Sequence, residues 1–518
     1  MKLEALHNLE IRLLQLLIIV LPLNGIPQRF SLPGLGGDLG NYVCLLMIIV
    51  LCYKYAKYRF TISKKAITFF AVFIVWQIIC LALGLITYEY NELLTLEQIS
   101  KLEVILAYAS NFGIEINELV AIKCWLFFRF IKNILLLNNI VFFVAFYIYH
   151  LYQSDFRKAF QDIRKAVVVL VVIMGTYSFI ELLWLKLDLD FAKRFFEFIN
   201  PYLYEPKSSH GWWPPLLWKN QLRSICSEPS YFGILSVFCI PFLWSLLLEN
   251  KHKILSSLLI FYFTLMIAAT NARTAIILVF VEIICFGILT LIAKNKAIVK
   301  NFVVIISISA LAFGVNLINF RQLTNNTNSQ NAIVTAEKYL QNNVVSVTNI
   351  KARSNSARLA NLVANLETIR QYPVFGVGYG LKDAYIDSNL PKFAYSNNEV
   401  KTWSRYMHAK GVLKSGYPAL NKYTDIAVQN GLIGLCLYFC PLLYILKKLY
   451  ENKRYLLREC NIIMVIITMI ALLGAMISNS VLVICNGIIW GLLFCKIKEI
   501  ENRKYEKTNF NQSYLQVK

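Results

Sequence analysis

Apolar residues fill most of this chain in runs that are long enough, or nearly long enough, to cross a lipid bilayer. Polar segments separate twelve such runs. They are Ile11–Leu23, Tyr42–Tyr58, Ile67–Thr87, Ile134–Tyr152, Ala166–Leu185, Tyr231–Leu248, Ile254–Ala269, Thr274–Ala293, Val299–Ile318, Ile426–Leu446, Ile462–Met476 and Val481–Cys495. The pattern predicts an all-α polytopic membrane protein with about twelve transmembrane helices.

The longest polar segment, Asn319–Tyr423, separates the ninth run from the tenth. Its first part is rich in asparagine between Asn325 and Asn331 and poor in apolar residues. Within Ser354–Gln371, by contrast, apolar residues recur at helical spacing, and Pro373 follows. We expect an amphipathic helix here that begins near Arg358, lies across the outer ends of the bundle and packs on it through Leu362, Leu366 and Ile369.

Three parts of the chain follow from this pattern. Residues 1–318 form a transmembrane bundle of nine spans, residues 319–423 form a large loop with the amphipathic helix, and residues 424–518 hold spans ten to twelve and a basic tail. We see no internal repeat at a fixed period and no pair of Gly/Pro-broken spans, which weakens a secondary-transporter interpretation.

Charge determines the predicted orientation. The chain has 52 Lys and Arg against 30 Asp and Glu, a net charge of +22, and the basic residues lie mainly in the segments that follow the even-numbered runs. The positive-inside rule therefore places both termini in the cytoplasm and the Asn319–Tyr423 segment outside. The same distribution argues for a membrane and against nucleic acid as the partner.

Four arginines then lie on the outer side, where the positive-inside rule disfavours them: Arg223, Arg273, Arg358 and Arg405. For any one of them, contact with lipid headgroups is an alternative explanation. As a group they suggest recognition of phosphate or diphosphate, because the planar guanidinium donates paired, charge-assisted hydrogen bonds.

Glu228 lies between Arg223 and the sixth run, in the sequence Ser227-Glu228-Pro229. Proline is tolerated in the first turn of a helix, and Ser227 is a suitable cap. We expect Glu228 on the first turn, where it is either a functional carboxylate or a simple complement to the positive helix end.

Neither a disulfide framework nor a metal site is indicated. The twelve cysteines lie mostly within or beside the apolar runs and form no Cys-x-x-Cys pair, and the five histidines are scattered. Asp188 and Asp190 resemble a metal-binding pair, but nearby Lys186 and Lys193 favour a solvated surface patch. Outer arginines and one carboxylate suit a metal-free, cofactor-free reaction whose leaving group is a lipid diphosphate.

Several motifs resemble the O-antigen polymerase and O-antigen ligase superfamily of bacterial polysaccharide assembly. The resemblance covers the chain from about the fifth run to the C-terminus. It rests on a glutamate-proline-serine stretch, a threonine-x-x-arginine turn, a proline-x-x-glycine-x-glycine loop and an asparagine followed by glycine-leucine-isoleucine-glycine. These are found in Leu222–Gly233, Ala269–Ala275, Tyr372–Gly380 and Asn421–Gly434.

The resemblance implies a C-type glycosyltransferase-like enzyme of the bacterial inner membrane that acts at its outer face on undecaprenyl-diphosphate-linked glycans. Its catalytic residues would be Glu228, Arg273 and Arg358. Its partners would be the lipid-linked oligosaccharide and membrane lipid, with a chain-length regulator and a flippase of the same pathway as further candidates. Its substrate-binding residues would be Arg223, Arg405, His408, Asn421, Tyr423, Gly376 and Gly378.

One departure from the family pattern bears on the reaction. Ligases carry histidine and then asparagine before the tenth span, whereas this chain has Leu420 and Asn421, and its nearest histidine is His408. This favours a polymerase of the Wzy type over a ligase. A flippase or exporter, which would place charges such as Glu282 along the spans, and a non-catalytic scaffold remain as alternatives.

Overall fold

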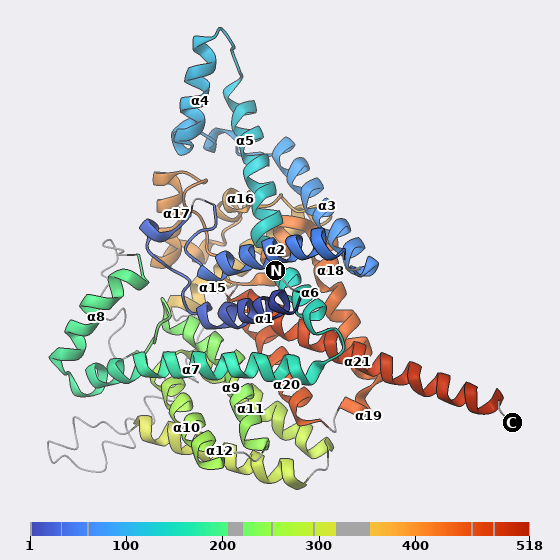
Figure 1. Cartoon of the computed structure of the whole chain (residues 1–518). Coiled ribbons are helices and arrows are strands. Elements are labelled where there is room, and N and C mark those ends of the chain that lie inside the picture. The colour runs from blue at the N-terminus through green and yellow to red at the C-terminus, as the bar shows by residue number, and fades with distance from the viewer. Residues whose placement is uncertain are drawn as a thin grey trace.

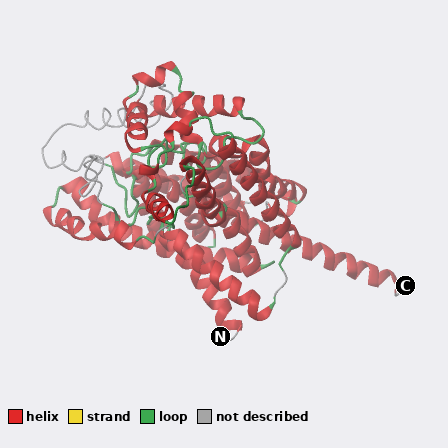
Figure 2. Cartoon of the chain, turned by 90° about the horizontal axis from the view of Figure 1, so that it is seen from above, coloured by secondary structure: helices red, strands yellow, loops and turns green. Residues whose placement is uncertain are grey.

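The computed structural model describes residues 3–32, 34–59, 62–205, 221–249, 252–293, 296–317, 353–456, 459–479 and 482–516. The asparagine-rich stretch Asn325–Asn331 lies outside these ranges. Throughout the described ranges, the regular elements are helices, as Figure 2 shows. The predicted all-helical fold is therefore confirmed.

The first half of the chain forms α1 to α12, of which α7 is the longest. The helices are α1 Leu3–Val20, α2 Leu39–Tyr58, α3 Lys64–Ile86, α4 Ser100–Asn111, α5 Glu118–Asn133, α6 Ile140–Tyr152, α7 Phe156–Leu187, α8 Asp190–Leu203, α9 Pro229–Leu248, α10 Lys253–Ala269, α11 Arg273–Ala293 and α12 Lys296–Leu317.

The second half continues with three shorter helices and then returns to the bundle. Its helices are α15 Arg353–Gln371, α16 Lys382–Ser388, α17 Asn398–Lys410, α18 Lys422–Glu451, α19 Lys453–Leu456, α20 Cys460–Ala475 and α21 Val483–Gln516. The C-terminal part of α21 extends away from the rest of the molecule (Figure 1).

The twelve apolar runs fall largely on helices α1, α2, α3, α6, α7, α9, α10, α11, α12, α18, α20 and α21. By length and apolar character alone, seven helices of the described chain qualify as spans, or eight when α5 and α6, bent by 41° at their junction, count as one. Two shorter apolar helices, α10 and α20, are also present. A multi-pass architecture is thus supported, and the number twelve stays a prediction.

Helix α9 is the most enclosed of the candidate spans. It packs against α7, α10, α11, α12 and α20, and side chains all around it, such as Phe238 and Trp244, are fully buried. Trp244 stacks on Phe286 of α11 with ring centroids 5.8 Å apart. A helix that is apolar on every side is expected in such a position, and its fixed place positions Glu228 at its N-terminal end.

The predicted packing face of α15 was wrong at Leu366, whereas Ile369 is half-buried and packs against a buried apolar cluster. Leu366 is 51% exposed, whereas the fully buried positions are Ala357, Ala360, Ala364 and Thr368. Helix α15 packs against α18, α16 and α17. Small side chains let helices approach closely, so alanines, and not the leucines that helical spacing singled out, form the contact face.

We therefore expect Ala360→Leu to destabilise the protein by about 1–3 kcal/mol, because a larger side chain overpacks a closed helix interface. The midpoint of thermal unfolding in detergent measures this effect. Leu366→Ala is the matched control on the exposed face of the same helix and should leave the midpoint unchanged. Equal midpoints for the two variants would contradict the assigned face.

Helix α18 is broken at Gly431, whose backbone has φ 68° and ψ 179°. The loop that follows α15 pairs with the backbone groups at this break. Val377 N donates to Val428 O at 2.8 Å, Gly378 N donates to Gln429 O at 3.1 Å, and Leu432 N donates to Pro373 O at 2.8 Å. A non-helical break in an apolar span is tolerated where protein groups satisfy its polar atoms.

Gly376 and Gly378 are required by this contact. Both have positive φ, 67° and 91°, which favours glycine. A Cβ on Gly376 would lie 2.3 Å from Val428 O. The two predicted substrate-binding glycines therefore hold the loop against α18.

Candidate functional site

The predicted site lies where several helices begin. Glu228 is the N-cap of α9, Arg273 begins α11, and Asn421 is the N-cap of α18. Backbone contacts join these ends: Leu222 N, before α9, donates to Ala269 O at the end of α10, and Lys422 N donates to Met476 O just after α20. Helix N-termini carry free N–H groups and partial positive charge, which favour anions.

Arg358 connects this region to α15. Its side chain is half-buried, and its Nη1 donates to Ser478 O at 3.1 Å. Burial lowers the pKa of Arg358, Glu399 and Glu228 raise it, and Arg273 lowers it. The charges of Arg358, Arg273, Glu228 and Glu399 therefore share one environment, although they come from four different helices. We refer to these four residues as the Arg358 cluster.

Arg273 has unused hydrogen-bonding capacity. The residue is half-buried, and its Nη1 is closed off from the protein surface with no hydrogen-bond partner among the described residues. An enclosed donor without an acceptor is costly. An anion such as a phosphate would supply the missing acceptor.

Glu228 lies one position earlier in the helix than the sequence predicted. It is the N-cap itself, Pro229 is the first helical residue, and Glu228 Oε2 accepts a hydrogen bond from Ser230 Oγ at 3.2 Å. The expected capping role of Ser227 was wrong, because Ser227 Oγ instead donates to Asn24 Oδ1 at 2.9 Å. The carboxylate remains at the mouth of α9, half-buried.

Arg223 lies in a different environment. It is 4% exposed, and its guanidinium lies 4.7 Å from the centre of the Tyr204 ring. The buried Glu181 accepts hydrogen bonds from the backbone N–H groups of Arg223, at 3.1 Å, and of Ser224, at 2.8 Å. These contacts connect α7 and the end of α8 to the loop before α9. They indicate that Arg223 holds these segments together.

Arg405 and His408 lie on α17, and both are exposed. His408 Nε2 is 3.0 Å from Asp387 Oδ2, and Asp387 also accepts a hydrogen bond from Tyr417. His408 borders a polar cavity of about 490 Å³. We call it the α17 cavity; it lies between the segment Glu92–Gln98 and the segment Met407–Lys414.

Asn421 and Tyr423 are engaged in the fold itself. Asn421 Oδ1 accepts hydrogen bonds from the backbone N–H groups of Tyr423 and Thr424, at 3.0 and 3.1 Å. Tyr423 donates its hydroxyl hydrogen to Leu473 O at 2.7 Å. Asn421 is thus a helix cap of the usual kind, and Tyr423 ties α18 to α20.

A charged group that the sequence reasoning missed lies beside the Arg358 cluster. Lys382 of α16 forms a buried ion pair with Asp425 of α18, and Lys422 Nζ is 3.9 Å from the same carboxylate. Lys422 and Arg358 both bind the turn after α20, at Met476 and Ser478. The i,i+3 spacing of Lys422 and Asp425 at the start of a span could have indicated this charged group from the sequence. The sequence around Glu399 and Lys382 contains no comparable pattern.

Metal-ligand geometry is not found in the described part of the chain, where no group of three or more His, Cys, Asp or Glu side chains gathers. Asp188 and Asp190, at the junction of α7 and α8, are both exposed.

Arg273, Arg358, Arg405 and the loop that contains Gly376 and Gly378 all lie within one segment that matches a known family. Residues 258–439 match the family model of O-antigen ligase. The match covers about a third of the chain, from α10 to the first part of α18, and agrees with the predicted resemblance to the O-antigen polymerase and ligase superfamily. It contains Arg273, Arg358, Gly376 and Asn421. No curated protein matches the chain.

The match is compatible with both a polymerase-type and a ligase-type function and does not distinguish them. Glu228 and Arg223 lie before the matched segment. The structure brings Glu228 close to the matched arginines, whereas Arg223 joins Tyr204 and Glu181.

Proposed function

We propose that this protein is a metal-independent polymerase that joins undecaprenyl-diphosphate-linked repeat units at the periplasmic face of the bacterial inner membrane. The observation that carries the proposal is the Arg358 cluster, in which two arginines and two carboxylates from four helices share one charge environment. The family match supports the reaction class.

In the proposed reaction, the donor diphosphate binds between Arg273 and Arg358. A hydroxyl at the non-reducing end of the acceptor attacks the anomeric carbon of the donor sugar. A new glycosidic C–O bond forms, the bond from that carbon to the diphosphate oxygen breaks, and undecaprenyl diphosphate leaves with the electron pair. The arginines stabilise the charge that develops on the leaving oxygen.

The hydroxyl proton needs an acceptor or an orienting group. Glu228 supplies either function, because its carboxylate lies within the same charge environment as Arg358. We assign Glu399 to positioning: its charge acts on Arg358 more strongly than that of Arg273 or Glu228. This keeps the guanidinium in place when no substrate is bound.

The sugar portion has room in the α17 cavity. Helix α17 carries Glu399 at its N-terminal end and His408 near its C-terminal end, about 14 Å apart along the axis. A glycan whose diphosphate binds at Arg358 could extend along α17 into this polar cavity, with Arg405 on the way. This supports a site for an oligosaccharide.

We favour polymerase over ligase because of the Leu420-Asn421 pair. The histidine expected in ligases is missing at Leu420, and Asn421 is occupied as a helix cap. A surface polymer such as an O-antigen would then be the product, and a flippase and a chain-length regulator would act with the enzyme.

The purified full-length protein, incubated with a lipid-linked repeat unit in the presence of EDTA, tests the proposal. A ladder of lipid-linked polymer is the expected product. A single transfer to lipid A core, when that acceptor is supplied, would identify a ligase. Faster movement of the lipid-linked unit across liposomes without any transfer would identify a flippase and contradict the enzyme.

Topology is a separate prediction. A single reporter cysteine at the exposed position Ser388, in a variant without native cysteines, should react with a membrane-impermeant maleimide added from the periplasmic side. The control is a cysteine at the exposed Lys447, in the basic last turns of α18, which should react only from the cytoplasmic side. Labelling of the Ser388 position from the cytoplasmic side would place the Arg358 cluster on the wrong side of the membrane.

A variant at Glu282 distinguishes the proposed enzyme from a transporter. This residue is fully buried in α11, and both carboxylate oxygens lack a hydrogen-bond partner among the described residues. A lone ionised carboxylate inside a span is expensive, so we expect Glu282→Gln to preserve both polymer formation and thermal stability. Glu228→Gln is the contrasting variant and should reduce the rate. If the wild type moves the lipid-linked unit across liposomes without forming polymer, and Glu282→Gln abolishes that movement, the result would favour proton-coupled transport.

A further inference from the structure

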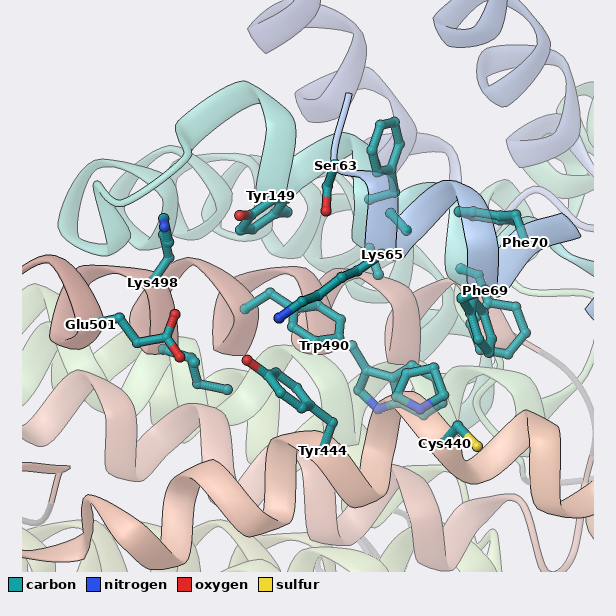
Figure 3. A pocket seen from close by; sticks show the side chains of 17 residues that line it. Ser63, Lys65, Phe69, Phe70, Tyr149, Cys440, Tyr444, Trp490, Lys498 and Glu501 are labelled. Carbon is teal, nitrogen blue, oxygen red and sulfur yellow. The ribbon is translucent and has the colours of Figure 1, made fainter. Parts of the chain in front are cut away.

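A second cavity lies far from the Arg358 cluster, between α3, α6, α18 and α21. It has a volume of about 300 Å³, near the lower end for ligand pockets. Most of its wall is aromatic and apolar (Figure 3). The rings that line it include Phe69, Phe70, Phe142, Phe146, Tyr149 and Trp490.

This cavity lies at the other end of α18 from the site. Tyr444, which lines the cavity, lies 13 residues after the break at Gly431, which corresponds to roughly 20 Å of helix beyond the break. Lys65 and Lys498, which also line it, belong to basic segments that the positive-inside rule assigns to the cytoplasm. In the predicted topology the cavity therefore lies at the cytoplasmic leaflet.

One end of the cavity is polar. Lys65, Lys498 and Glu501 line it, and Figure 3 shows Lys65 extending across the cavity toward Tyr444. Glu501 is 3.2 Å from Lys448 and is thus already paired. Lys65 and Lys498 form no ion pair with any described residue. The polar end therefore carries two cationic groups without an anionic partner of their own.

We propose that this cavity binds an anionic phospholipid of the cytoplasmic leaflet. One acyl chain lies along the aromatic wall, and the phosphate lies between Lys65 and Lys498. The apolar wall suits any lipid chain, whereas the two lysines select for negative charge, since a basic residue near such a surface attracts anionic lipids. This binding is independent of the proposed polymerase reaction.

Native mass spectrometry of the full-length protein from mixed micelles tests this. The micelles contain equal amounts of phosphatidylglycerol and phosphatidylcholine, and the retained lipids are counted. Lys65→Ala combined with Lys498→Ala should lower retained phosphatidylglycerol by roughly tenfold. The matched control is Lys64→Ala combined with Lys447→Ala, which removes two exposed lysines that do not line the cavity; it should behave as the wild type.

A second variant tests the apolar wall. Cys440 lines the cavity and is exposed, so Cys440→Trp should fill the space without disturbing the core. It should lower retained phosphatidylglycerol while leaving the unfolding midpoint unchanged. Equal retention of both lipids by the wild type, equal loss in the two lysine double variants, or preferential retention of added undecaprenyl phosphate over phosphatidylglycerol would each overturn the proposal.

Discussion

Arg358→Ala and Arg273→Ala are each expected to slow polymer formation by about a hundredfold or more. A charge-assisted donor that stabilises the departing diphosphate contributes roughly 2–4 kcal/mol to the transition state. Arg273 already has an enclosed Nη1 without a partner among the described residues, and Arg358 lies in the same charge environment. The measurement is the initial rate of ladder formation from a purified lipid-linked repeat unit.

The conservative variants sharpen this prediction. Arg358→Lys should restore part of the rate, because lysine keeps the charge and loses the planar fork. Arg370→Ala is the matched control on the same helix: Arg370 is exposed, pairs with Glu367 and should leave the rate unchanged. A normal rate in Arg358→Ala, with correctly folded protein, would remove the cluster from the mechanism. A raised KM with an unchanged kcat would mean that Arg358 binds the substrate and the transition state equally and does not stabilise the departing charge.

The bundle was predictable because a membrane imposes one simple rule. Every apolar run must satisfy its backbone polar groups internally, so long apolar runs become helices. The runs that predicted spans accordingly coincide with helices such as α9 and α18. The break at Gly431 was not predicted, because it depends on the distant loop around Gly376, which supplies the missing hydrogen bonds.

The outer helices were predicted less well. Helices α8, α16 and α17 are short, and their burial depends on partners far along the chain, so local periodicity carries little information about them. Leu366 illustrates the limit: its spacing fits an apolar face, yet alanines form the contact because α15 packs closely against its neighbours.

The site was predicted in part. Residue type and side of the membrane were enough to select Arg273, Arg358 and Glu228, which the structure brings together. They could not separate these residues from Arg223, because the ring of Tyr204 that covers its guanidinium becomes a neighbour only in the folded chain. Glu399 was missed for the same reason.

The glycine at the break of α18 yields the second large expected effect. A Cβ on Gly431 would lie 1.8 Å from Val374 O, and the residue has φ 68°. This conformation, with positive φ and ψ near 180°, is essentially restricted to glycine and costs an L-residue about 1–3 kcal/mol. The clash must also displace the loop and its three hydrogen bonds to α18. We expect Gly431→Ala to destabilise the protein by more than about 4 kcal/mol.

Gly113→Ala is the control that isolates the backbone strain, because Gly113 also has a positive φ, 74°, but a Cβ added there would meet no atom within 4 Å. Thermal unfolding in detergent should show a large drop of the midpoint for Gly431→Ala and a small one for Gly113→Ala. Because the displaced loop directly follows α15, any folded Gly431→Ala protein should also lose polymer formation. Similar midpoints for the two variants would mean that the loop after α15 tolerates displacement. The position of Arg358 would then not depend on the contact between this loop and α18.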